Sequence, residues 1–276
     1  MPKSQLGRVG HVMHGFAKVN SSLHARSAGV TGSTIQAVVI SLRSSTTRRA
    51  AMAETLRGWD LPWHFFDALG ADGPCAIEED HARQIVEYKR RLTPAELGCY
   101  KSHHKVLSDF VAAPQSDWLM VLEDDVWFDT EFDCRRLVGQ LEERGIGYIR
   151  LFAKAFKHAD VVDCIDGREL IRFRTDPVGL QIFLISHAAA KRALASIDAI
   201  TTAIDHELGR FWRNGLDNYS IFPFPALERA SPSTIGHETL EEYALRRKPP
   251  FLKRLAFRTA GYLNKRAANL KFRLRA

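Results

Sequence analysis

The sequence contains no long apolar run. No segment approaches the roughly 18 consecutive apolar residues that a membrane-spanning helix requires, and residues 1–34 lack the apolar centre of a secretory signal peptide. These absences argue against a membrane-spanning protein, and we expect a chain that stays in the cytosol. At 276 residues, of which 45% are hydrophobic, the chain is long enough for one large α/β domain or two small ones.

Cysteine is scarce and widely spaced. Cys75, Cys99, Cys134 and Cys164 form no Cys-x-x-Cys pair. This spacing argues against a cysteine zinc site and excludes the closely spaced disulfide framework of small secreted domains. We therefore expect reduced, mostly buried thiols.

Acidic residues are missing from the C-terminal part of the chain. Residues 243–276 hold 11 of the 39 Lys and Arg residues and no Asp or Glu, so 28 basic residues face 32 acidic ones in the rest. The net charge of +7 therefore belongs to the tail, and the body has no electrostatic reason to bind nucleic acid. Residues 1–34 have four basic residues, no acidic residue and no sustained period. We predict that they form a disordered extension.

Three consecutive carboxylates follow an apolar pentad. Residues 118–122 are apolar without alternation, which is typical of a strand covered on both faces, and Glu123, Asp124 and Asp125 come next. Ligands of open α/β sheets bind at the carboxyl ends of such strands. Because clustered carboxylates repel one another, the pattern favours a hard divalent cation that would hold phosphates. The alternative is a strand end in which one Asp caps the next segment.

The first part of the chain predicts a strand, a polar loop and a helix. Residues 35–42 form the strand, and the polar turn at residues 43–49 carries arginines and four hydroxyl groups and leads into a helix from about residue 48 to residue 59. Such a loop at a helix N-terminus suits an anionic phosphate, or it supplies ordinary helix caps. Residues 63–67 predict a second strand.

The tetrapeptide Thr93-Pro94-Ala95-Glu96 predicts a helix start, with Thr as N-cap, Pro at the first position and Glu three residues after the cap. The helix is expected to end near Ala113. His103 interrupts its apolar stripe and either is a satisfied helix histidine or faces a substrate.

The rest of the chain alternates between strands and helices, which predicts an α/β domain with a mainly parallel sheet over residues 35–236. Helices are expected at 132–144 and 187–194, a hairpin at 161–164 and 170–173, and strands at 148–152, 179–186 and 219–223. Asp205 and His206 are adjacent, a pair that can supply a base and a metal ligand, although Asp205 is equally suited to cap a helix.

Four blocks resemble glycosyltransferase family 25, the lipopolysaccharide and lipooligosaccharide sugar transferases. They are Val39-Ile-Ser-Leu42 with Arg48-Arg49, residues 92–103, residues 121–126, and Gly179 with residues 183–186. The resemblance implies a GT-A type nucleotide-sugar fold and a divalent cation, usually Mn²⁺, with Mg²⁺ as the alternative. It also implies transfer of a sugar, often galactose, from a UDP-sugar to a lipopolysaccharide or other cell-surface glycan, with inversion.

The resemblance also assigns roles to residues. Metal binding falls to Glu123 and Asp125, with His206 added by its place beside Asp205. Nucleotide contacts fall to a set of six residues, and the catalytic base to Asp205 or, second, Glu96. The six residues are Leu42, Arg48, Arg49, Ser102, His103 and Asp124. Thr47 and Ala203 depart from the family pattern, in which an Asp and a Pro are common.

The tail, residues 237–276, predicts a basic amphipathic helix after Pro249-Pro250. Apolar residues recur at steps of one, three or four from Leu252 to Leu274. We expect residues 251–276 to bind an anionic membrane on the cytoplasmic face and to bring the enzyme to a lipid-linked acceptor. The alternative is a helix packed on the domain with a solvated basic face. Two other readings of the whole chain stay open: another metal-dependent enzyme, such as a nucleotidyltransferase or phosphohydrolase, and a non-catalytic membrane-binding module.

Overall fold

The computed structural model describes residues 32–155, 157–229 and 249–275. They belong to one compact unit, Gly32–Ala276. Of the disordered extension predicted for residues 1–34, residues 1–31 lie outside the described residues, and so do residues 230–248. Residues 33 and 34 depart from the prediction, because Ser33 donates to Glu142 and Thr34 donates to Asp117.

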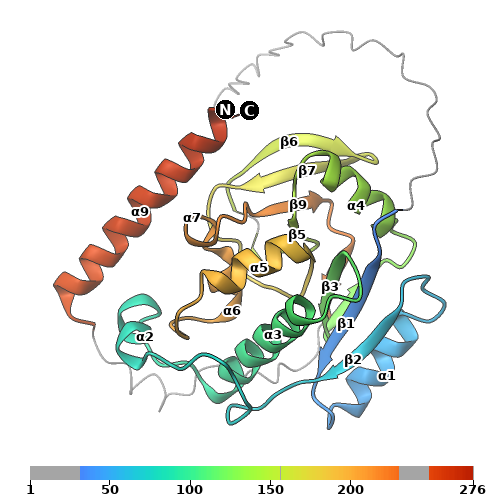
Figure 1. The fold of residues 1–276 in the computed structure, drawn as a ribbon, viewed down its shortest axis with the longest axis horizontal. Coiled ribbons are helices and arrows are strands. Elements are labelled where there is room, and N and C mark those ends of the chain that lie inside the picture. The colour runs from blue at the N-terminus through green and yellow to red at the C-terminus, as the bar shows by residue number, and fades with distance from the viewer. Residues whose placement is uncertain (1–31, 156, 230–248, 276) are drawn as a thin grey trace, which may run out of the picture. The chain divides into compact units, whose positions relative to one another are not determined.

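A single eight-stranded sheet forms the centre of this unit (Figure 1). Its strand order is β2-β1-β3-β8-β5-β9-β7-β6. The strands are β1 Ile35–Ser41, β2 Trp63–Asp67, β3 Trp118–Glu123, β5 Tyr148–Arg150, β6 Ala159–Ile165, β7 Arg168–Phe173, β8 Ile182–Ser186 and β9 Tyr219–Phe222. A separate antiparallel pair joins β4 Val126–Phe128 to β10 Ala226–Glu228.

The predicted α/β class is confirmed. Strand β1 lies parallel to both β2 and β3, so these three strands end at one edge of the sheet. Strands β5 and β9 are also parallel, whereas β8 runs antiparallel to β3 and β5, and the predicted hairpin β6–β7 is antiparallel. The sheet is therefore mixed, and its parallel part is the part that carries the acidic strand end.

Helices cover both faces of the sheet. They are α1 Thr46–Thr55, α2 His81–Glu87, α3 Pro94–Ala112, α4 Cys134–Glu143, α5 His187–Ala195, α6 Ile204–Gly209, α7 Phe211–Asn214 and α9 Phe251–Arg273. The predicted start of α3 is confirmed, because the Thr93 hydroxyl accepts from the Glu96 N–H and the Glu96 carboxylate accepts from the Thr93 N–H.

Strand β3 divides the core between the two faces. Trp118, Met120 and Leu122 pack in one apolar cluster with α1 and α4, while Leu119 and Val121 pack in the other with α3 and α5. All five side chains are at most 2% exposed. This burial on both faces is what the unbroken apolar pentad predicted.

None of the helices in the described parts of the chain combines the length and apolar character needed to cross a bilayer. The four cysteines are free thiols, but the expectation that most of them are buried is wrong: Cys134 is buried, Cys75 and Cys99 are partly buried, and Cys164 is exposed.

Candidate active site at the carboxyl ends of β1 and β3

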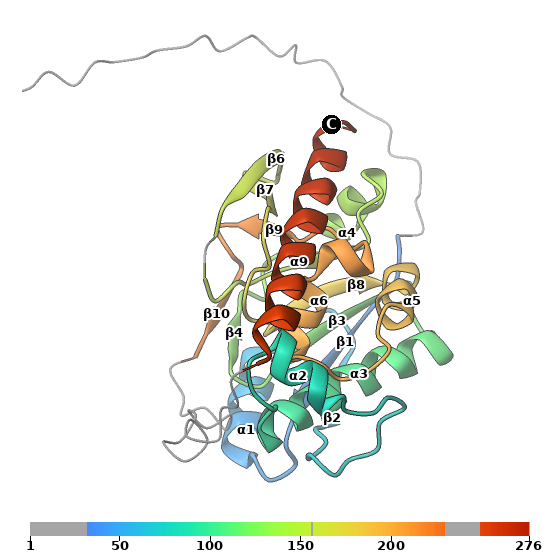
Figure 2. The ribbon, with the colours of Figure 1, turned by 90° about the vertical axis from the view of Figure 1, so that its left-hand side faces the viewer.

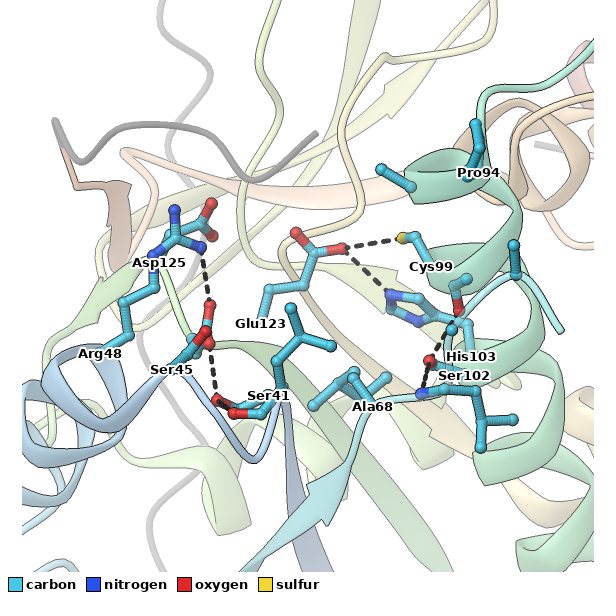
Figure 3. A pocket seen from close by; sticks show the side chains of 18 residues that line it. Ser41, Ser45, Arg48, Ala68, Pro94, Cys99, Ser102, His103, Glu123 and Asp125 are labelled. Atoms are coloured by element: carbon cyan, nitrogen blue, oxygen red, sulfur yellow. Dashed lines mark hydrogen bonds and ion pairs between the residues drawn. The ribbon is translucent and has the colours of Figure 1, made fainter. Parts of the chain in front are cut away.

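A cavity of about 340 Å³ lies where β1 and β3 end. Its walls come from these strand ends, the N-terminal part of α1, the loop after β2 and the first turns of α3 (Figure 3). The structure brings together here most of the residues that the sequence had singled out: Leu42, Arg48, Ser102, His103, Glu123, Asp124 and Asp125. Segments far apart in the chain therefore form one acidic cavity with a basic wall.

Asp124 is buried and engaged. Its carboxylate accepts a hydrogen bond from the Ser41 hydroxyl at 2.6 Å and pairs with the Arg48 guanidinium at 3.1 Å. These contacts tie the end of β3 to the end of β1 and to α1. Asp124 therefore positions Arg48 at the cavity wall.

Asp125 has one carboxylate oxygen without a hydrogen-bond partner among the described residues. Its Oδ1 is buried and no described residue donates to it. Burial, the largest cause, and the negative charge of Glu123 together raise the pKa of Asp125 to about 6, although the Arg48 cation opposes the shift. A bound cation would therefore stabilise the ionised form of Asp125 more than that of Asp124, which is already paired with Arg48.

Glu123 turns toward α3, away from Asp125 (Figure 3). Its Oε1 lies 3.1 Å from His103 Nε2 and accepts from the Cys99 thiol at 3.8 Å. Burial, followed by the charge of Glu123, raises the pKa of Cys99 well above its ordinary value, so this thiol stays protonated. The three groups offer ligand atoms within 4.8 Å of one another.

Arg49 and Ser102 hold the cavity walls. The Arg49 guanidinium donates to the carbonyl of Ser41 and pairs with Asp67 at the end of β2, so it braces two strand ends and does not line the cavity. The Ser102 hydroxyl donates to the Gly98 carbonyl and accepts from the Leu69 N–H at 2.8 Å. It thereby fixes the loop after β2 against α3.

A second cavity, also of about 340 Å³, adjoins the first and shares Cys99 and Glu123 with it. Glu96, Asp205 and His206 line this second cavity. The Asp205 carboxylate accepts from the Gly179 N–H at 3.1 Å and from the His206 N–H at 2.8 Å. Two backbone N–H groups thus orient the Asp205 carboxylate, and neither of these contacts involves a cationic side chain.

Glu96 and His206 each have a firm partner. Burial opposes ionisation of Glu96, but hydrogen bonds from Arg90, Thr93 and Tyr88 outweigh it and lower the Glu96 pKa. His206 Nδ1 lies 2.6 Å from Asp176, and this hydrogen bond raises the pKa of His206. His206 lines the second cavity and Asp125 the first, so the structure does not bring these two predicted metal ligands into one cavity.

The sequence analysis missed Cys99, Tyr88, Lys154 and Asp176. Cys99 had a signal, since it lies one helical turn before His103 and both face Glu123. The other three lie on loops whose return to the site no local pattern indicates.

An acidic cavity at the carboxyl ends of parallel strands, beside a helix N-terminus, places the chain among α/β proteins built to bind anionic ligands at that edge. A comparison with protein families identifies the family. A family model described as glycosyltransferase family 25 (LPS biosynthesis protein) matches residues 34–208, and the chain belongs to this family. The protein is therefore a glycosyltransferase, as the four sequence blocks implied.

Solved structures add two similar chains. A glycosyltransferase involved in the glycosylation of the major capsid of PBCV-1 is 11% identical, with a TM-score of 0.34 over 65% of this chain and 74% of that chain. The 4-diphosphocytidyl-2C-methyl-D-erythritol synthase of Anaerococcus prevotii is 12% identical, with a TM-score of 0.32 over 78% and 97%. No curated protein matches the chain. The family assignment therefore rests on the family model.

Proposed function

We propose that this enzyme transfers a hexose, with galactose as the first choice, from a UDP-sugar to a hydroxyl of a lipopolysaccharide or other cell-surface glycan, with inversion at the sugar carbon. The observation that carries the proposal is the unpartnered, buried Asp125 oxygen beside Arg48. The Asp125 carboxylate can bind a divalent cation and the Arg48 guanidinium can bind a phosphate, so the site suits a diphosphate bound together with a divalent cation.

The residues present fit such a cation, for which Mn²⁺ is the first choice and Mg²⁺ the second. Asp125 would hold it through the Oδ1 atom that accepts no hydrogen bond from a described residue, whereas Glu123, which lines the same cavity, is turned toward His103 and Cys99. When bound, the cation supplies positive charge that stabilises the diphosphate leaving group. His206 fits less well, because its Nδ1 is bound to Asp176 in the other cavity.

The diphosphate would lie against α1. Ser45 is the N-cap residue of α1, yet its side chain makes no capping hydrogen bond, and it lines the cavity. The Thr46 N–H already donates to the Ser44 carbonyl at 2.9 Å, so a phosphate at this helix end would depend on the positive end of the helix dipole and on the Arg48 guanidinium in the first turn. Ordinary capping, the alternative for this loop, is not what Ser45 does.

The acceptor would enter the second cavity, with Asp205 as its base. As the acceptor oxygen attacks the sugar carbon, its proton passes to the Asp205 carboxylate, and UDP leaves with the electron pair of the broken C–O bond. Glu96 is the weaker choice because Arg90, Thr93 and Tyr88 already bind its oxygens. Because the two cavities share the wall formed by Cys99 and Glu123, a donor in one and an acceptor in the other would lie side by side.

Asp125→Asn tests the donor site. The change keeps the size of the side chain and removes its charge, so release of UDP from UDP-galactose with Mn²⁺ should fall by at least about 100-fold. The melting temperature should hold or rise, because repulsion with Glu123 is relieved.

Asp129→Asn, on the segment after β4 and outside both cavities, is the matched control. Full activity in folded Asp125→Asn would overturn the assignment, and release of free phosphate in place of UDP would favour a phosphohydrolase.

A further inference from the structure

The C-terminal helix α9 has two unlike faces. Seven of its positions are partly buried and recur at helical spacing: Arg254, Phe257, Gly261, Lys265, Ala268, Asn269 and Phe272. Five leucines are between 50% and 79% exposed: Leu252, Leu255, Leu263, Leu270 and Leu274. At about 100° per residue, the leucines fall on the side of the helix opposite the partly buried positions.

Specific contacts fix the inner face at the C-terminal end of α9. The guanidinium of Arg172, itself 1% exposed, donates to Asn269 Oδ1 at 2.8 Å and lies 4.0 Å from the centroid of the Phe272 ring. The Asn269 side chain in turn donates to the Arg174 carbonyl at 3.0 Å. A buried arginine in β7 thus holds the last turns of the helix.

The N-terminal end of α9 is held as well. Arg254 donates to the carbonyls of Val86 and Glu87, where α2 ends. Farther along, the Lys265 ammonium lies 4.6 Å from the Trp212 ring centroid in α7. With both ends anchored, the exposed leucine face points away from the domain, and Figure 2 shows α9 running along the outside of the domain on the side facing the viewer.

Basic residues border the leucine face. Lys253 and Lys271 lie on one flank, Arg266 and Arg273 lie on the other, and all four are exposed. Residues 249–275 contain eight Lys and Arg and no acidic residue. A surface that needs only solubility mixes both signs of charge, and this one does not.

We propose that α9 docks the enzyme on an anionic lipid bilayer, with the five leucines at the acyl boundary and the flanking Lys and Arg among the headgroups. The charge distribution favours lipid over a second copy of the chain. Pairing two α9 helices through their leucines would bring like charges together with no acidic residue to offset them. An anionic leaflet complements the same surface.

Docking would also place the acceptor cavity toward the lipid. The first turns of α9 contact the end of α2, and the next residue, Tyr88, lines the cavity that holds Asp205. The partner would then be a glycan carried on a lipid, at the cytoplasmic leaflet. This last step rests on the proposed function, whereas lipid binding itself does not.

Flotation of the full chain with vesicles tests the proposal. Binding is expected to vesicles containing phosphatidylglycerol, to weaken with salt, and to be lost with pure phosphatidylcholine. Leu263→Gln/Leu270→Gln and Lys253→Gln/Lys271→Gln should each weaken binding by about 30-fold. The control Lys191→Gln/Arg192→Gln removes two exposed charges from α5 and should bind as the wild type does.

Three results would overturn the proposal. They are equal binding to neutral vesicles, unchanged binding of the leucine variant, and a wild-type protein that ignores lipid but forms dimers that the leucine variant breaks. Helical content measured by circular dichroism verifies that α9 persists in each variant. Transfer to a soluble acceptor should be unchanged in all variants, so failure of the docking proposal is distinguishable from failure of the proposed function.

Discussion

Glu123, Asp124 and Asp125 are consecutive in the sequence, but each carboxylate has different surroundings. Asp124 is paired with Arg48 and Ser41, Glu123 contacts α3, and the buried oxygen of Asp125 has no donor in the described residues. Repulsion among three carboxylates is thus relieved for two of them by the protein itself. The third is left for a ligand, which is why Asp125 carries the proposal.

Asp205→Asn separates catalysis from binding. An amide cannot take up the acceptor proton, so turnover should fall by about two to four orders of magnitude. The affinity for UDP, measured by calorimetry, should be unchanged because Asp205 lines the other cavity. If affinity falls while turnover at saturating donor holds, Asp205 positions the donor and the base lies elsewhere.

Glu96→Gln tests whether Glu96 is structural. Glutamine can still complete the cap of α3, but it loses the ion pair with Arg90, so the free energy of unfolding should fall by about 1–3 kcal/mol at pH 7. The folded pKa of Glu96 lies below its ordinary value of 4.5. Its contribution is therefore present above that pH and is lost as the pH falls through the folded pKa. The stability difference between the two proteins, measured by urea unfolding, should shrink below about pH 4, and a constant difference would contradict the ionic cause.

Sequence could place the residues of the site but not the directions of their side chains. The apolar pentad predicted strand β3, and the position of the three carboxylates directly after it predicted that they lie at the end of that strand. Whether Glu123 would face Asp125 or His103 depends on α3, which packs against β3 through tertiary contacts alone. Arg49 likewise matched a family position, yet it braces β1 against β2.

At the scale of elements, long periodic segments were predicted well and short ones were missed. Strand β3 and the start of α3 agree with the sequence, because an unbroken apolar run, a cap and a proline act locally. The antiparallel entry of β8, the short helices α2 and α7, and the pair β4–β10 were not predicted. Their formation depends on contacts with distant segments.

Gly98→Ala should disturb the packing of α3 against the loop after β2, which lines the donor cavity. A Cβ at this position would lie 2.6 Å from the Leu69 carbonyl and 3.3 Å from the Gly70 carbonyl carbon, so the loop would shift. We expect a lower melting temperature and weaker UDP binding, despite the better helix propensity of alanine.

Gly139→Ala in α4 is the matched control. No atom lies within 4 Å of a Cβ built there, so the same substitution should stabilise the protein by about 0.5–1 kcal/mol and leave UDP binding unchanged. Gly98→Ala with wild-type affinity and a raised melting temperature would show that the loop moves freely.

For the whole molecule, the arrangement that matters is the order of the parts around the sheet. The parallel strands β2, β1 and β3 end at the donor cavity, the Asp205 cavity adjoins it, and α2 leads from there to α9. Local periodicity predicted α9 but not which of its faces would meet the domain. Asn269 and Phe272 do so because Arg172 offers a hydrogen bond and a cation–π contact, and Lys265 does so because its ammonium lies over the Trp212 ring.

Phe272→Ala and Leu270→Ala, two residues apart on the same helix, test that seating. Phe272 contacts the Arg172 guanidinium and the Tyr219 ring, so its loss should cost about 2 kcal/mol, whereas Leu270 is 59% exposed and its loss should cost under about 0.5 kcal/mol. Because terminal elements open locally at lower free energy than the whole domain, amide hydrogen exchange over residues 251–273 is the appropriate measurement. Exchange should quicken by about 30-fold in Phe272→Ala and by no more than about threefold in Leu270→Ala. The reverse order would mean that the leucine face, and not the aromatic face, meets the domain, and it would remove the exposed surface on which lipid docking depends.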